Sequence, residues 1–212
     1  MLKKLFHYSF IMALIVSLLM ISVQSYAESV QYVIDGDTII LKNRQHVRYI
    51  GINAPEIANK KRNKKAEPFG EASKKYNQKL LQNKKIRLEF DKTKKDQYNR
   101  VLAYIFLEDG TFVNGEIIKQ GLGFCLYDRQ NNHYAKRLLK LQQKAMSQGK
   151  GIWSRIKKLK GKVVGSRRSR RFHTPECKFG KRISKRNRVW FNSQWEAFKK
   201  GYSPGKKCFG AK

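Results

Sequence analysis

The sequence predicts an α+β protein: a five-stranded β-barrel of the OB type with three helices, followed by a small basic α/β module. Short runs of β-branched and aromatic residues indicate strands, and helical patterns interrupt them once and then follow them. This order suits a small closed barrel. A second observation is that the composition changes after Trp153: acidic residues become rare beyond it, whereas basic residues remain frequent.

The first 27 residues have the pattern of a secretory signal peptide. Lys3 and Lys4 precede an apolar stretch around residues 10–23, and small residues lead up to Ala27. A membrane anchor is the alternative, but the stretch is shorter than the about 20 apolar residues that a spanning helix needs. We therefore expect cleavage after Ala27 and a secreted or periplasmic protein without stable membrane insertion.

The barrel segment covers residues 28–155, and its strands can be assigned in order. Residues 32–42 and 46–52 are predicted as strands, because β-branched residues dominate both and a polar turn at 43–45 joins them. Further strands are expected at 85–90 and 101–107, and a tight turn follows the latter at Glu108, Asp109 and Gly110.

Three helices belong to the same segment. The first begins at Pro68, a residue favoured in the first turn of a helix. The second spans 113–120 and is ended by Gly121. The third is marked by Tyr134, Leu138, Leu141 and Ala145 and is expected to end near Gly149 and Gly151. The first helix is expected to bury an apolar stripe at helical spacing, formed by Phe69, Ala72, Tyr76 and Leu80.

The charge predicts a polyanionic partner. Lys and Arg number 47 against 15 Asp and Glu, which gives a formal charge of +32. Nucleic acid is the simplest partner for such a surplus. Solvent-exposed charged surfaces are the alternative, but they explain individual lysines and not a threefold excess of basic over acidic residues. An anionic membrane surface is a weaker alternative, since the basic runs do not accompany one long apolar helical stripe. Residues 156–212, a linker at 156–162 and a module at 163–212, hold 19 of the basic and 2 of the acidic residues.

Three short segments carry polar residues of particular types: 33–39, 47–56 and 96–101. The first two contain oxygen ligands, and the last two contain one arginine each. Carboxylate and amide oxygens suit a hard divalent cation. A planar guanidinium can bind a phosphate through two hydrogen bonds, and a further carboxylate can orient or deprotonate a water. Together these groups predict metal-assisted hydrolysis of a phosphodiester.

These segments resemble the staphylococcal nuclease (thermonuclease) family over roughly residues 30–153, in the same order and with similar spacing. The resemblance implies that Asp37 is the principal ligand of Ca²⁺ or another divalent cation. It implies that Asn53 is a second ligand and that Ala54 contributes its backbone carbonyl. The family has an acidic ligand at the position of Asn53, so the lost charge predicts weaker calcium binding or a relaxed metal requirement.

The same resemblance implies the catalytic and substrate-binding residues. Glu56 would orient or activate the attacking water, and Arg48 and Arg100 would neutralise the phosphate in the transition state. Tyr98 and Tyr127 match positions that line the nucleotide site, where base stacking tolerates any sequence.

The implied activity is that of an exported, metal-dependent endonuclease. It would cut DNA and RNA with little sequence preference, leave 3′-phosphate ends and act as a monomer. The alternative is a nucleic-acid-binding protein on the same barrel without catalysis. The presence of Arg48, Glu56 and Arg100 together argues against that alternative.

The C-terminal module resembles the small zinc-binding module of the Ada DNA-repair protein. Its four Zn²⁺ ligands would fall at His173, Cys177, Gly205 and Cys208. Gly205 has no ligating side chain, so the site would be incomplete for a structural zinc ion, which prefers four ligands. In an exported protein a disulfide between the two cysteines competes with zinc. A disulfide, a three-ligand zinc site and neither of these all remain open.

The remaining features of the module are its basic runs. Residues 167–171 and 181–188 are rich in Lys and Arg, and we expect them to hold the enzyme on its polymeric substrate. Nuclear targeting inside a host cell is an alternative role for the same runs. Cys125 is then the odd thiol, which we expect to be buried.

Overall fold

The computed structural model describes residues 27–59, 63, 65–156, 160–205 and 208. The predicted signal peptide lies outside these residues, except for Ala27. Residues 60–62 and 64, in a stretch rich in Lys and Arg, and residues 157–159 of the predicted linker also lie outside the described residues. Among the described residues, no helix is both long and apolar enough to cross a bilayer.

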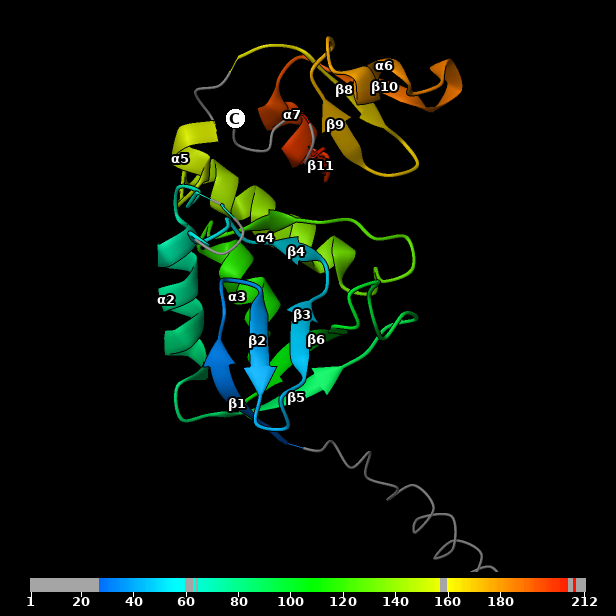
Figure 1. Ribbon diagram of the computed structural model, residues 1–212. Coiled ribbons are helices and arrows are strands. Elements are labelled where there is room, and N and C mark those ends of the chain that lie inside the picture. The colour runs from blue at the N-terminus through cyan, green and yellow to red at the C-terminus, as the bar shows by residue number, and fades with distance from the viewer. Residues whose placement is uncertain (1–26, 60–62, 64, 157–159, 206–207, 209–212) are drawn as a thin grey trace, which may run out of the picture.

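A closed five-stranded β-barrel forms the first part of the protein, in the order β1-β2-β3-β6-β5 (Figure 1). Neighbouring strands are antiparallel except β3 and β6, which run parallel. Residues of β1 pair with β5 and close the barrel. This architecture confirms the predicted α+β fold. The strands are β1 (Glu28–Val33), β2 (Thr38–Leu41), β3 (His46–Tyr49), β5 (Lys85–Glu89) and β6 (Val101–Leu107).

The strands differ from the sequence prediction in two places. The single strand expected at 32–42 is divided into β1 and β2, because residues 34–37 leave the barrel in a turn. The strand expected at 46–52 is interrupted at Gly51, whose φ of 79° no β-strand accommodates. Its last part is β4 (Ile52–Asn53), which pairs with β7 (Phe124–Cys125), a two-residue strand that the sequence did not predict.

Four helices accompany the barrel: α2 (Gly70–Leu81), α3 (Val113–Lys119), α4 (Ala135–Ser147) and the short α5 (Trp153–Ile156). The apolar stripe predicted for the first helix is confirmed in part: Phe69, Tyr76 and Leu80 are half-buried and pack against apolar clusters, whereas Ala72 is exposed. The fully buried residues of α2 lie one position further along: Gly70, Ser73, Asn77 and Leu81. Ser73 and Asn77 on this face are polar, and they are buried where they form hydrogen bonds. A search for apolar residues at helical spacing cannot detect such a face.

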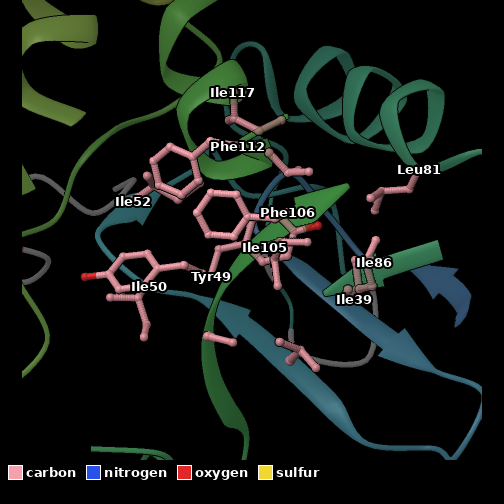
Figure 2. Close-up of a cluster of buried hydrophobic side chains, with 14 of the residues drawn as sticks. Ile39, Tyr49, Ile50, Ile52, Leu81, Ile86, Ile105, Phe106, Phe112 and Ile117 are labelled. Carbon is pink, nitrogen blue, oxygen red and sulfur yellow. The ribbon is translucent and has the colours of Figure 1, made fainter. Parts of the chain in front are cut away.

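The barrel core lies between the strands and helices α2, α3 and α4. Figure 2 shows side chains from several strands, among them Ile39, Tyr49 and Ile105, packed with Phe112 and Ile117 at the start of and within α3. All five are at most 3% exposed. Burial of this apolar surface is the main free-energy source for the fold.

The C-terminal module contains a four-stranded sheet in the order β10-β8-β9-β11. Its strands are β8 (Val163–Ser166), β9 (Arg171–His173), β10 (Arg188–Phe191) and β11 (Ser203–Pro204). Its helical elements are α6 (Lys178–Lys181), the 3₁₀ turn η2 (Lys185–Asn187) and α7 (Gln194–Lys199). Along the chain, β8 and β9 are followed by α6 and η2, and then by β10, α7 and β11, so the module contains both strands and helices, as predicted.

The module and the barrel share a second apolar core. Trp153 of α5 is fully buried, and its ring lies 5.1 Å from that of Phe198 in α7. Phe198 also meets Phe124 of β7 at 5.4 Å and Phe172 of β9 at 5.1 Å. The buried Gln142 of α4 joins both parts. Its side-chain amide donates to the Phe198 carbonyl of the module at 2.7 Å, and its side-chain oxygen accepts from the backbone amide of Cys125 in the barrel segment at 2.6 Å. The predicted boundaries at 155 and 163 therefore separate two sequence segments that both contribute to this second core.

This shared core predicts that the two parts unfold together. Phe198→Ala removes a ring from the contact, and we expect it to lower the free energy of unfolding by about 3–5 kcal/mol. Trp190→Ala, in the same module but 55% exposed, is the control and should cost about 0.5 kcal/mol or less. Thermal unfolding followed by circular dichroism should show one transition that moves only with Phe198→Ala. Two transitions, of which the barrel's stays unchanged, would contradict the shared core.

Candidate active site

The turn between β1 and β2 is held by buried polar side chains. Asp35 accepts a hydrogen bond at Oδ1 from the backbone amide of Asp37, at 2.9 Å. Asn77 of α2 donates to the Asp35 carbonyl at 3.0 Å and accepts from the Tyr49 hydroxyl at 3.0 Å. Gly36 has no room for a side chain, because a Cβ there would overlap the Ser73 hydroxyl. The turn is therefore fixed from α2 and from β3 at once.

Asp37 lies at the end of this turn with a buried carboxylate. Its Oδ2 accepts from the Ala54 amide at 2.6 Å and forms an ion pair with Arg48 Nη2 at 2.9 Å. Its Oδ1 accepts from the Thr38 hydroxyl at 3.0 Å. Burial raises the pKa of Asp37 to about 7, and the nearby Arg48 guanidinium only partly opposes this rise. A positive charge beside Asp37 favours the ionised carboxylate, against the effect of burial.

Arg48 points from β3 into the site, and its guanidinium is held by backbone carbonyls. Nη1 donates to the Tyr49 carbonyl and Nη2 to the Ile52 carbonyl, both at 2.9 Å. Nη2 also donates to Asn53 Oδ1 at 3.3 Å. The oxygens of Asp37 and Asn53 thus converge on one cationic nitrogen.

This donor set fits a hard divalent cation. The Asp37 carboxylate and the Asn53 amide oxygen come together at the same point, and the Ala54 carbonyl is within reach because it accepts from Asn53 Nδ2 at 3.1 Å. All three are oxygen donors, the type that Ca²⁺ prefers. They supply a single negative charge, fewer than a site with two carboxylates.

Glu56 lies on the loop two residues beyond Ala54. Its amide donates to Glu67 Oε2 at 3.0 Å, and its carbonyl accepts from the Glu67 amide at 2.8 Å. Helix α2 begins directly against this loop, because Gly70 has no side chain to contact the Glu56 carbonyl. Two hydrogen bonds to Glu67 and the start of α2 therefore hold the Glu56 main chain.

Arg100 lies one residue before β6 and is oriented by Asp96. Its Nε and Nη2 both contact Asp96 Oδ2, at 2.8 and 2.7 Å. Asp96 Oδ1 accepts from the amides of Tyr98 and Arg100, at 2.9 and 3.0 Å. Although burial raises the pKa of Asp96, these hydrogen bonds outweigh it and hold that pKa below its ordinary value. The sequence analysis assigned no role to Asp96. Its position four residues before Arg100 is the feature from which this ion pair could have been predicted.

The two predicted aromatic residues lie on different loops. Tyr98 is 72% exposed, and its ring centroid is 5.7 Å from the Arg100 guanidinium carbon. Tyr127 follows β7 and has the Arg170 guanidinium 5.5 Å from its ring. The Tyr98 ring is therefore accessible for stacking on a base, whereas the Tyr127 ring contacts an arginine of the C-terminal module.

Direct contacts thus bring together four of the predicted residues: Asp37, Arg48, Asn53 and Ala54. The other predicted residues are near them through the fold. Glu56 follows on the same loop, and Arg100 precedes Val101, which pairs with Val47 beside Arg48. Asn77, which holds the turn, and Ser73, which donates to the Leu122 carbonyl at 2.8 Å, were missed because they are polar residues outside the predicted apolar stripe.

The second predicted site lies in the C-terminal module. Cys177 and Cys208 form a disulfide with their Cα atoms 6.1 Å apart. His173 Nδ1 is 3.1 Å from Cys208 Sγ and 3.8 Å from Cys177 Sγ. The His173 ring fills the place of a side chain at Gly205, since a Cβ there would lie 2.6 Å from Nδ1. Cys125 is the buried free thiol that was expected.

Comparison with known proteins agrees with this geometry. Residues 46–155 match the family described as Staphylococcal nuclease homologue. The chain is 39% identical over 125 residues to the thermonuclease of Staphylococcus hyicus, covering 58% of this chain and 72% of the relative. It is 37% identical over 129 residues to the thermonuclease of Staphylococcus intermedius, covering 59% and 75%. It is 39% identical over 127 residues to the SPbeta prophage-derived endonuclease YokF of Bacillus subtilis, covering 58% and 42%.

The hydrogen bonds around the turn give a testable prediction. Asn77→Ala leaves the Asp35 carbonyl and the Tyr49 hydroxyl without partners, and we expect it to lower the free energy of unfolding by about 1–3 kcal/mol. The control is Gln78→Ala on the exposed face of the same helix, which should change it by about 0.5 kcal/mol or less. Urea denaturation measures both. Equal effects would mean that Asn77 does not hold the turn.

Proposed function

The chain belongs to the staphylococcal nuclease family and is a nuclease of the hydrolase class; from this premise we propose its specific activity. It is an exported, calcium-dependent endonuclease that hydrolyses DNA and RNA with little sequence preference, leaves 3′-phosphate ends and acts as a monomer. The observation that carries this proposal is the convergence of the Asp37 and Asn53 oxygens on the cationic nitrogen of Arg48.

In this proposal Asp37, Asn53 and the Ala54 carbonyl hold the calcium ion. When bound, the ion would supply positive charge to a phosphate oxygen of the substrate. Arg48 would then exchange its contact with Asp37 for the phosphate, while its bonds to the Tyr49 and Ile52 carbonyls keep it in place. In this exchange one cation replaces another beside the carboxylate, so Asp37 keeps a positive partner.

Arg100 would bind the same phosphate from the neighbouring strand. Asp96 fixes its guanidinium through two contacts, so the side chain is oriented before substrate binds. Charge grows on the phosphate oxygens as the water attacks, and two oriented arginines stabilise that charge more in the transition state than in the ground state.

Glu56 would act on the water. A water oxygen forms a bond to phosphorus and passes one proton to the Glu56 carboxylate, while the bond between phosphorus and O5′ breaks. The O5′ oxygen leaves with a proton from solvent, and the phosphate stays on the 3′ carbon of the other product. The position of Glu56 two residues beyond Ala54 supports this role.

Substrate breadth follows from the aromatic residues. Tyr98 is largely exposed and can stack on any base, and stacking does not distinguish sequences.

Export agrees with the disulfide between Cys177 and Cys208, a bond that persists in oxidising compartments. We propose that this oxidised pair, and not a zinc ion, is the form of the module outside the cell, since zinc needs thiolates.

The catalytic assignment predicts large losses of turnover. Glu56→Gln, Arg48→Ala and Arg100→Ala should each lower kcat by about 10²–10⁴-fold, because each removes a group that acts in the transition state. The matched controls are Glu108→Gln and Arg155→Ala, both exposed, which should keep wild-type turnover. Digestion of plasmid DNA and RNA with and without a chelator measures this. Near-normal cleavage by all three site variants would overturn the assignment.

The metal assignment predicts the effect of restoring the charge. Asn53→Asp adds a second carboxylate beside Asp37, so calcium should bind more tightly and the half-maximal calcium concentration for cleavage should fall. Asn43→Asp, in an exposed turn, is the control. Isothermal titration calorimetry gives the affinity independently of activity. If neither affinity nor calcium requirement changes, Asn53 does not contact the metal.

A further inference from the structure

The turn between β8 and β9 of the C-terminal module lies beside the barrel loop that follows β7 (Figure 1). Arg170 fixes this contact. Its guanidinium carbon is 5.5 Å from the Tyr127 ring and 5.2 Å from the Tyr202 ring, and Nη1 donates to the Lys200 carbonyl at 3.2 Å. Cation–π contact with two rings at such distances is stabilising. The turn is therefore docked on the barrel.

Between the turn and the loop lies an open cleft of about 320 Å³. We call it the arginine cleft, since Arg129 from the barrel and Arg168 and Arg171 from the module line it. Tyr127 forms one wall, and Asp128 is the acidic residue among the lining side chains. Arg129 and Arg168 are exposed. Three cations against one anion leave the cleft with a positive charge.

The arginine cleft is connected to the candidate active site through a short β-ladder. Asn53 pairs with Phe124 and Ile52 with Cys125. The next barrel-loop amide, of Leu126, donates to the Gly51 carbonyl at 2.9 Å. The strand that carries Asn53 thus positions Tyr127 and, directly beyond it, the cleft.

We propose that the arginine cleft is a phosphate subsite that holds the substrate strand beyond Tyr127, so that the C-terminal module forms part of the nucleic-acid groove. This inference rests on the proposed nuclease function. Guanidinium groups bind phosphate oxygens through paired hydrogen bonds, and exposed arginines beside an aromatic ring are the elements that bind single strands without sequence preference. The ligand is the phosphodiester backbone of DNA or RNA.

Docking of the module gives this subsite a function that a loosely tethered basic tail could not have. The shared core around Trp153 and Phe198 fixes the arginines relative to the barrel. A fixed subsite reduces the entropy lost when the substrate is oriented. Its contribution should therefore depend on substrate length, and only strands that reach the cleft should gain.

The test is a double variant, Arg129→Ala with Arg168→Ala, in the full-length protein. The control is Lys178→Ala with Lys199→Ala, which removes the same charge from exposed positions of the module that lie outside both basic runs and do not line the cleft. The first readout is the ratio of kcat/KM for a long single-stranded oligonucleotide to that for a dinucleotide. We expect the cleft variant to lower this ratio about tenfold, through KM, because charge-assisted hydrogen bonds are lost, and the control to keep it.

The second readout is independent of catalysis. Fluorescence anisotropy of the labelled oligonucleotide with Glu56→Gln protein, at several salt concentrations, gives the dependence of affinity on salt. The cleft variant in this background should lower the log–log slope by about 1.4, since two contacts to a single strand are lost. Equal changes in cleft variant and control, or no change in either, would overturn the subsite. Absence of cleavage by the wild type would instead contradict the proposed function and leave the slope as the test of the cleft.

Discussion

The buried ion pair between Asp37 and Arg48 is the interaction on which the candidate site depends. Two charges in an apolar surrounding are costly unless hydrogen bonds satisfy both. Here the carboxylate has Ala54 and Thr38 as additional donors, and the guanidinium has carbonyl acceptors. Those partners come from β2, from β3 and from the chain around β4, so the pair fixes three segments at one point of the barrel.

The C-terminal module extends this arrangement. Its apolar side chains continue the core beyond α4 and α5, and its Arg170 contacts Tyr127 on the loop that β4 and β7 position. The basic surplus of the chain is therefore not confined to a detached tail. Some of it is held at a fixed distance from the Asp37 cluster, where it can act on the same polyanion.

Sequence reasoning predicted the barrel well, because β-branched and aromatic residues recur in its strands, most densely in β2 and β6. It missed features that depend on single hydrogen bonds or on φ. The turn at 34–37, the break at Gly51 and the two-residue β7 have no periodicity to detect. Asp37, Arg48 and Asn53 could be named from their resemblance to a known family. Asn77 and Asp96 could not, since their function is to orient other residues, and neither could the contact between Trp153 and Phe198, because periodicity does not identify partners.

The most direct test of the account is calorimetric titration of calcium into the wild type and into Asp37→Asn. The variant keeps the shape of the side chain and removes the charge, and circular dichroism verifies that it is folded. The account predicts one calcium ion per chain for the wild type and a large loss of affinity for Asp37→Asn, with Glu108→Gln unchanged. Equal calcium binding by wild type and Asp37→Asn would contradict it, because the cation would then lie elsewhere.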